Sequence, residues 1–141
     1  MLGEFSGGVA VAGGSQSKIK PCVVIDATEG PVWIGRNVTI FPHSYVQGPA
    51  YIADDCLLQP GTTIHSGTTI GPGSKVGGEI EASIIQGYSN KQHDGFLGHS
   101  YLGSWVNIGA DCLNSDLKIP MARFVSRSTA TKSIAGNFSW G

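Results

Sequence analysis

An aliphatic residue recurs at every sixth position through the middle of the chain. The recurring positions are Ile34, Ile40, Val46, Ile52, Leu58, Ile64, Ile70 and Val76. A small or modest side chain stands four positions after each of the first seven, at Val38, Ser44, Ala50, Cys56, Thr62, Thr68 and Ser74. A period of six does not match the helical period of about 3.6, and one unbroken strand of this length would be far too long. The pattern therefore predicts a short strand and a corner every six residues, with three strands closing a triangular coil of about 18 residues.

The register of the hexads changes after Val76. The sequence predicts a slip of two residues at 77–79, after which the aliphatic series resumes. The expected core positions beyond the slip are Ile84, Phe96, Leu102 and Ile108. Asn90 stands where the same series calls for another aliphatic residue, within the polar stretch 89–95. A core position given up to polar residues is typical of a functional site.

The hexads also divide the chain into three segments. We expect residues 1–16 to form a flexible, Gly-rich N-terminus, residues 17–118 to form a β-helix domain of about five coils, and residues 119–141 to form a non-repeat tail or cap. Within the last segment, Pro120 at a first helical position and Gly136 as a stop favour a short helix that covers the open end of the prism.

The composition agrees with this interpretation. The 141 residues include 21 Gly, and only 13% are charged, against about 25% in an average protein. Gly suits repeated corners, and charge is scarce because stacked coils bury one side of every strand. A net charge of −1 gives no electrostatic basis for binding nucleic acid or an anionic membrane. No apolar run approaches the length of about 20 residues that a membrane helix requires.

The first residues of the chain lack the basic and continuously apolar regions of a secretion signal. Cys22, Cys56 and Cys112 are odd in number and have no metal-binding spacing. The sequence therefore predicts a cytoplasmic protein with free, reduced thiols.

The hexads resemble those of the bacterial hexapeptide acyltransferase family, whose fold is a single-stranded, left-handed parallel β-helix. The stretch SNKQHDGFLGHSYLGSWVNIGAD, at residues 89–111, is more specific. It is similar to the acetyltransferase domain of bifunctional sugar-1-phosphate acetyltransferase/nucleotidylyltransferases. The resemblance implies an all-β left-handed helix that assembles as a homotrimer. We expect a truncated relative, because the later coils that complete the CoA groove and the nucleotidylyltransferase half have no counterpart here.

The resemblance also implies roles for individual residues. His93 falls on the general base, which removes a proton from a substrate amine as the nitrogen attacks the thioester of acetyl-CoA; an imidazole suits this step because its pKa lies near working pH. Asn107 falls on a residue that contacts the sugar and the acetyl group. Ala110 falls on the residue whose backbone N–H binds the thioester carbonyl oxygen.

Two further residues are candidates for substrate binding, and several positions depart from the family pattern. Lys91 is expected to contact phosphate or CoA, and Asp116 replaces an Asn that follows the catalytic coil. The basic residues that hold the sugar phosphate fall on Thr63 and Glu81, and the Tyr after the base is Phe96. We expect an acetyl-CoA-dependent N-acetyltransferase-like domain for an amino sugar or sugar phosphate, with activity weakened or lost where the later coils are missing.

Two alternatives remain open. The first is a non-catalytic trimeric β-helix scaffold that keeps the fold without the chemistry. The second is a γ-class carbonic anhydrase-like zinc enzyme, since the spacing of Gln59 and His65 resembles that family, and His93 and His99 supply further imidazoles. A six-residue spacing puts such side chains on different faces of the coil, which does not favour convergence on zinc. We therefore expect no metal site.

Overall fold

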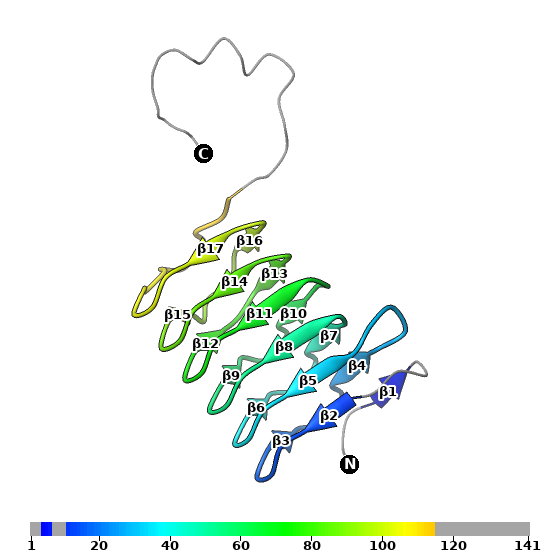
Figure 1. Cartoon of the computed structure of the whole chain (residues 1–141). Coiled ribbons are helices and arrows are strands. Elements are labelled where there is room, and N and C mark those ends of the chain that lie inside the picture. The colour runs from blue at the N-terminus through cyan, green and yellow to red at the C-terminus, as the bar shows by residue number, and fades with distance from the viewer. Residues whose placement is uncertain (1–3, 7–10, 115–141) are drawn as a thin grey trace, which may run out of the picture.

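Short β-strands, linked by corners, make up the part of the chain that the computed structural model describes, residues 4–6 and 11–114 (Figure 1). No helix occurs within these residues. The strands are β1 Glu4–Ser6, β2 Val11–Gly13, β3 Lys18–Ile19, β4 Val24–Asp26, β5 Val32–Ile34, β6 Thr39–Ile40, β7 Tyr45–Gln47, β8 Ala50–Ile52, β9 Leu57–Leu58, β10 Thr63–Ile64, β11 Thr68–Ile70, β12 Lys75–Val76, β13 Glu79–Glu81, β14 Ile84–Ile85, β15 Asn90–Lys91, β16 Phe96–Gly98 and β17 Tyr101–Leu102.

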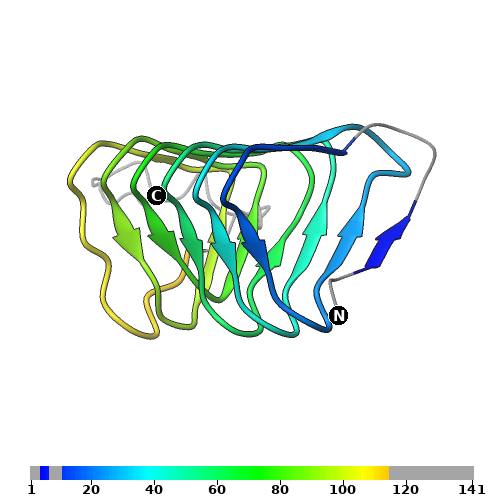
Figure 2. The same ribbon diagram turned by 90° about the horizontal axis from the view of Figure 1, so that it is seen from below.

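Each turn of the chain contributes one strand to each of three parallel sheets. Sheet A has the order β1-β4-β7-β10-β13-β16, sheet B has β2-β5-β8-β11-β14-β17, and sheet C has β3-β6-β9-β12-β15. Five complete turns are followed by β16, β17 and a parallel bridge between Asn90 and Asn107. The turns lie side by side along one axis (Figure 2). The predicted all-β parallel coil is confirmed, and the architecture is consistent with a left-handed parallel β-helix.

The hexad residues form the core, as predicted. All eight aliphatic positions from Ile34 to Val76 are 0–1% exposed, and the seven small positions that follow them are also buried. Ile34 pairs with Ile52, and Ile52 with Ile70, so equivalent side chains stack in one column along the axis. The buried hydroxyls of Ser44, Thr62 and Ser74 donate to backbone carbonyls; for example, Thr62 Oγ1 donates to the carbonyl of Gln59.

A slip of two residues follows Val76 at the predicted place but in the opposite direction: the next inward residue is Ile80, four residues on, whereas the predicted series resumes at Ile84, eight residues on. Gly residues make this slip sterically feasible. Thr63 pairs with Tyr45 on the preceding turn and with Glu79 on the following turn. The turn from Thr63 to Glu79 is two residues shorter than the turn from Tyr45 to Thr63. Only Gly77 and Gly78 link β12 to β13. A Cβ on Gly77 would lie 2.3 Å from the carbonyl oxygen of Gln92, and Gly78 has a φ of +74°. A residue with a side chain would therefore be strained at either position.

The register expected beyond the slip is wrong by one residue at Ile84 and at Phe96. Ile84 is 46% exposed, whereas Ile85 is 1% exposed and Leu97 is 8% exposed. The corner between β13 and β14 is one residue shorter than its counterpart on the preceding turn, so Ile84 pairs with the outward-facing Thr69. Because side chains alternate between the two faces of a strand, this change exchanges the inward and outward positions.

The parallel pairing begins before residue 17. β1 pairs with β4, and β2 pairs with β5, so strands within residues 1–16 extend sheets A and B. The helix expected from Pro120, the remainder of the tail at 119–141 and the candidate residue Asp116 lie outside the described residues.

Candidate functional site

The corner between β15 and β16 carries the candidate base. Four residues, 92–95, make this connection, as at the equivalent corners 20–23, 41–44 and 59–62, whereas the preceding turn has only two. His93 and Asp94 are exposed there. Gly95 closes the corner with a φ of +137°, and a Cβ there would lie 2.2 Å from the carbonyl oxygen of Cys112. The corner thus presents an imidazole and a carboxylate to solvent.

The next turn brings two other candidate residues to the same corner. Asn107 pairs with Asn90, and the N–H of Asp111 donates to the carbonyl of Asp94 over 2.9 Å. The two residues of each pair are separated by the same number of positions in the sequence. Ala110 and His93 have this separation too, so Ala110 lies opposite His93 on the neighbouring turn. Asn107 and Ala110 are exposed. The fold therefore gathers His93, Asn107 and Ala110 at one corner between sheets C and A.

Lys91 faces the interior instead of solvent. Lys91 is 2% exposed, and its Nζ donates to the carbonyl of Gly77 over 2.9 Å and to the carbonyl of His93 over 3.0 Å. Burial lowers the pKa of Lys91, while negative charge on Asp94 and on Cys112 acts in the opposite direction. The ammonium that was expected to contact phosphate or CoA is therefore occupied by the backbone of its own chain.

The other histidines considered in the sequence lie apart from this corner. His99 stands at a corner between sheets A and B, where its N–H donates to the carbonyl of Glu81. His65 Nε2 lies 2.7 Å from Glu79 Oε2 on the outer face of sheet A. Gln59 Nε2 donates to Gln92 Oε1 over 3.0 Å, passing over Gly77. Among the residues that the structure describes, no three His, Cys, Asp or Glu side chains gather where they could hold a metal ion.

The three cysteines are free thiols, as predicted. Cys22 and Cys112 are exposed, while Cys56 is buried and its Sγ lies 3.1 Å from the carbonyl oxygen of Gly71. Burial raises the pKa of Cys56 to about 11, so this thiol is protonated and unreactive at neutral pH.

A shallow groove on the outside of sheet B was not anticipated from the sequence. It encloses about 570 Å³ and is bordered by Tyr51, Thr69, Ile84 and other residues of sheet B and its corner. Trp33 and Tyr51 stack face to face, with ring centroids 4.7 Å apart. The sequence does contain an indication of this stacking. Each aromatic residue immediately precedes a hexad isoleucine, and the two isoleucines occupy equivalent places on successive coils.

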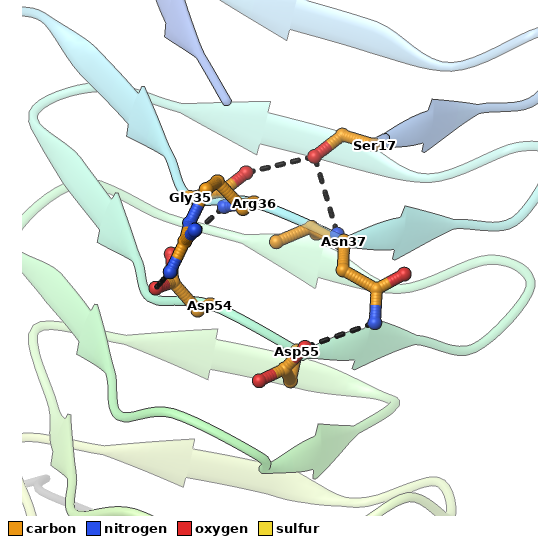
Figure 3. Close-up of polar contacts among 7 residues, drawn as sticks. Ser17, Gly35, Arg36, Asn37, Asp54 and Asp55 are labelled. Carbon is orange, nitrogen blue, oxygen red and sulfur yellow. Dashed lines mark hydrogen bonds and ion pairs between the residues drawn. The ribbon is translucent and has the colours of Figure 1, made fainter. Parts of the chain in front are cut away.

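A polar ladder joins successive turns beside this groove (Figure 3). The N–H of Arg36 donates to Asp54 Oδ1 over 2.8 Å, and Asn37 Nδ2 donates to Asp55 Oδ1 over 2.9 Å. One turn earlier, Ser17 Oγ donates to the carbonyl of Gly35. The Arg36–Asp54 ion pair is long, at 3.5 Å, and its Arg side chain is 71% exposed, so it contributes little. These contacts serve to align the turns.

Comparison with known protein families gives one match. Residues 31–66 match the family described as bacterial transferase hexapeptide (six repeats). Together with the parallel β-solenoid, this match supports a hexapeptide-repeat transferase family. The matched hexapeptide repeats span β5 to β10 and end before His93. No curated protein matches the chain. In the described part of the chain, no helix is long and apolar enough to cross a membrane. These hexapeptide repeats are compatible with a transferase-like protein or a β-helix scaffold.

Proposed function

We propose that this chain is an acetyl-CoA-dependent N-acetyltransferase-like domain that acts on an amino sugar or an amino sugar phosphate. The observation that supports the proposal is the exposed corner at 92–95. It places His93 beside the turn that carries Asn107 and Ala110.

The proposed chemistry uses these residues in three roles. The His93 imidazole takes a proton from the substrate amine while the nitrogen forms a bond to the thioester carbonyl carbon of acetyl-CoA. The backbone N–H of Ala110 stabilises the negative charge that develops on the carbonyl oxygen. The C–S bond then breaks, and the proton held by His93 passes to the departing CoA sulfur. Asn107 orients the sugar and the acetyl group.

The proposal includes a homotrimer whose subunits meet through the outer face of sheet B. The outer column of this sheet is Trp33, Tyr51, Thr69, Ile84 and Tyr101, which contains no charge. Its four large apolar side chains are 41–63% exposed. The outer faces of the other sheets carry charge, with Glu79 and Glu81 on sheet A and Lys18 and Lys75 on sheet C. Sheet B is therefore the face best suited to contact other copies.

Replacing Ile84 with Lys is expected to convert the trimer to monomers, because the ammonium would be buried without a partner in the interface. Light scattering coupled to gel filtration measures the mass of the assembly. Gln47→Lys introduces the same side chain on the outer face of sheet A and serves as the matched control. A trimer that survives Ile84→Lys would exclude sheet B as the interface.

Acetyl-CoA is expected to stabilise the folded chain if its groove is present. At a ligand concentration of about 100 times Kd, binding to the native state contributes about 2.7 kcal/mol, which corresponds to a rise of several degrees in Tm. Thermal unfolding monitored with and without acetyl-CoA measures this effect, and acetyl phosphate at the same concentration is the control. A folded trimer whose Tm does not respond to acetyl-CoA would favour the scaffold function over the acetyltransferase.

A further inference from the structure

Lys91 occupies a position that the fold reserves for an aliphatic side chain. In sheet C, Ile40 pairs with Leu58, Leu58 with Val76, and Val76 with Lys91, so all four belong to one inward column. The first three are 0% exposed, and Lys91 is 2% exposed. Within the described residues, Lys91 forms no ion pair with a carboxylate. Burying an ammonium in this way is costly, and an aliphatic residue would fill the column without that cost.

The contacts of the ammonium explain why a lysine is present at this position. Its two acceptors lie where consecutive turns diverge, one at the short link of Gly77 and the other at His93, in the four-residue corner of the next turn. Gly77 N–H also donates to the carbonyl of Lys91 over 2.7 Å. Beyond this point the two turns lose their register, because one has two residues where the other has four. On the preceding turn the equivalent carbonyl, that of Gln59, accepts from the Thr62 hydroxyl, and at Gly77 the ammonium supplies this hydrogen bond.

We propose that Lys91 is a positioning residue for His93, holding the corner at 92–95 so that the imidazole stays beside Asn107 and Ala110. The role of His93 as a base rests on the proposed function, but the ordering of the corner by Lys91 does not. Methionine has a similar length and fits an apolar column, so Lys91→Met removes the two hydrogen bonds while keeping the packing. The buried ammonium therefore lowers the stability of the fold but fixes the position of the corner.

The test compares Lys91→Met with two control variants. Lys75→Met removes a neighbouring exposed lysine, and Val76→Met introduces methionine one turn earlier in the same column. Backbone order is measured by ¹⁵N relaxation, in which rigid residues give order parameters near 0.85 and flexible ones fall below about 0.6. For Lys91→Met alone, we expect the order parameters of residues 93–95 to fall toward the flexible range, while the denaturation midpoint is no lower than that of the wild type. The kcat of acetyl transfer is expected to fall about 10- to 100-fold, with KM for acetyl-CoA little changed.

Unchanged order at residues 93–95 in Lys91→Met would overturn the proposal, and so would a loss of order spread evenly over all turns. If corner order falls but the wild type has no acetyltransferase activity, the positioning role stands and the proposed function fails. The wild type provides a second measurement should Lys91→Met not fold. Its Lys91 ammonium protons should exchange slowly with water and show ¹⁵N coupling to the carbonyl carbons of Gly77 and His93. Rapid exchange without such coupling would also overturn the proposal.

Discussion

Replacing Ile85 with Ala is expected to lower the free energy of unfolding by about 2–5 kcal/mol. Ile85 is 1% exposed and lies between Ile70 and Leu102 in the inward column of sheet B. Truncation removes three carbons from this column, and the turns above and below are held by strand pairing and cannot collapse to fill the cavity. Urea unfolding at a fixed protein concentration measures the change.

Two further variants bracket this result. Ile64→Ala removes a 0% exposed side chain from the regular part of the helix and is expected to have a cost in the same range. Leu57→Ala truncates a partly exposed side chain on β9 and should cost about 1 kcal/mol. If Ile85→Ala resembled Leu57→Ala rather than Ile64→Ala, the register of the last turns described above would be wrong.

Replacing His93 with Ala is expected to reduce the kcat of acetyl transfer by about 10²–10⁴-fold, the typical contribution of a general base. The exposed imidazole lies outside the core, so folding and assembly should be unaffected. Release of free CoA thiol in the presence of an amino sugar measures the rate. Light scattering checks that the variant assembles as the wild type does.

His43→Ala is the matched control for this prediction. His43 is also exposed at a corner between sheets C and A, three turns earlier, and that corner has the same length as the one at 92–95. This variant should retain the wild-type rate. A rate for His93→Ala within about threefold of the wild type would remove His93 as the base.

The regular part of the fold is predictable from sequence because one physical rule repeats there. From Ile34 to Val76 each side of the triangle takes six residues, so one inward position locates the others. Beyond Val76 two consecutive steps between inward residues are shorter, four residues to Ile80 and five more to Ile85, so the hexad no longer predicts the inward positions. The two-residue slip preserves the inward alternation and could be detected, whereas the single-residue shortening before Ile84 reverses it.

The candidate site was only partly predictable, for a related reason. His93, Asn107 and Ala110 follow from a resemblance, and their meeting at one corner then depends on the length of the last turn, which the regular hexad does not give. The interior position of Lys91 was not predictable, because a lysine in a polar stretch is ordinarily exposed. Its partners are backbone carbonyls, one of them on another turn, and no side-chain pattern in the sequence indicates them.

The chemistry is tested most directly by looking for the acetylated product. Purified wild-type protein and His93→Ala are incubated with isotopically labelled acetyl-CoA and a set of amino sugars and amino sugar phosphates, and the sugars are examined by mass spectrometry. We predict a labelled N-acetyl sugar with the wild type and only background label with His93→Ala. Equal labelling by the two proteins, or no labelling by a folded wild-type trimer, would contradict an acetyltransferase site at this corner.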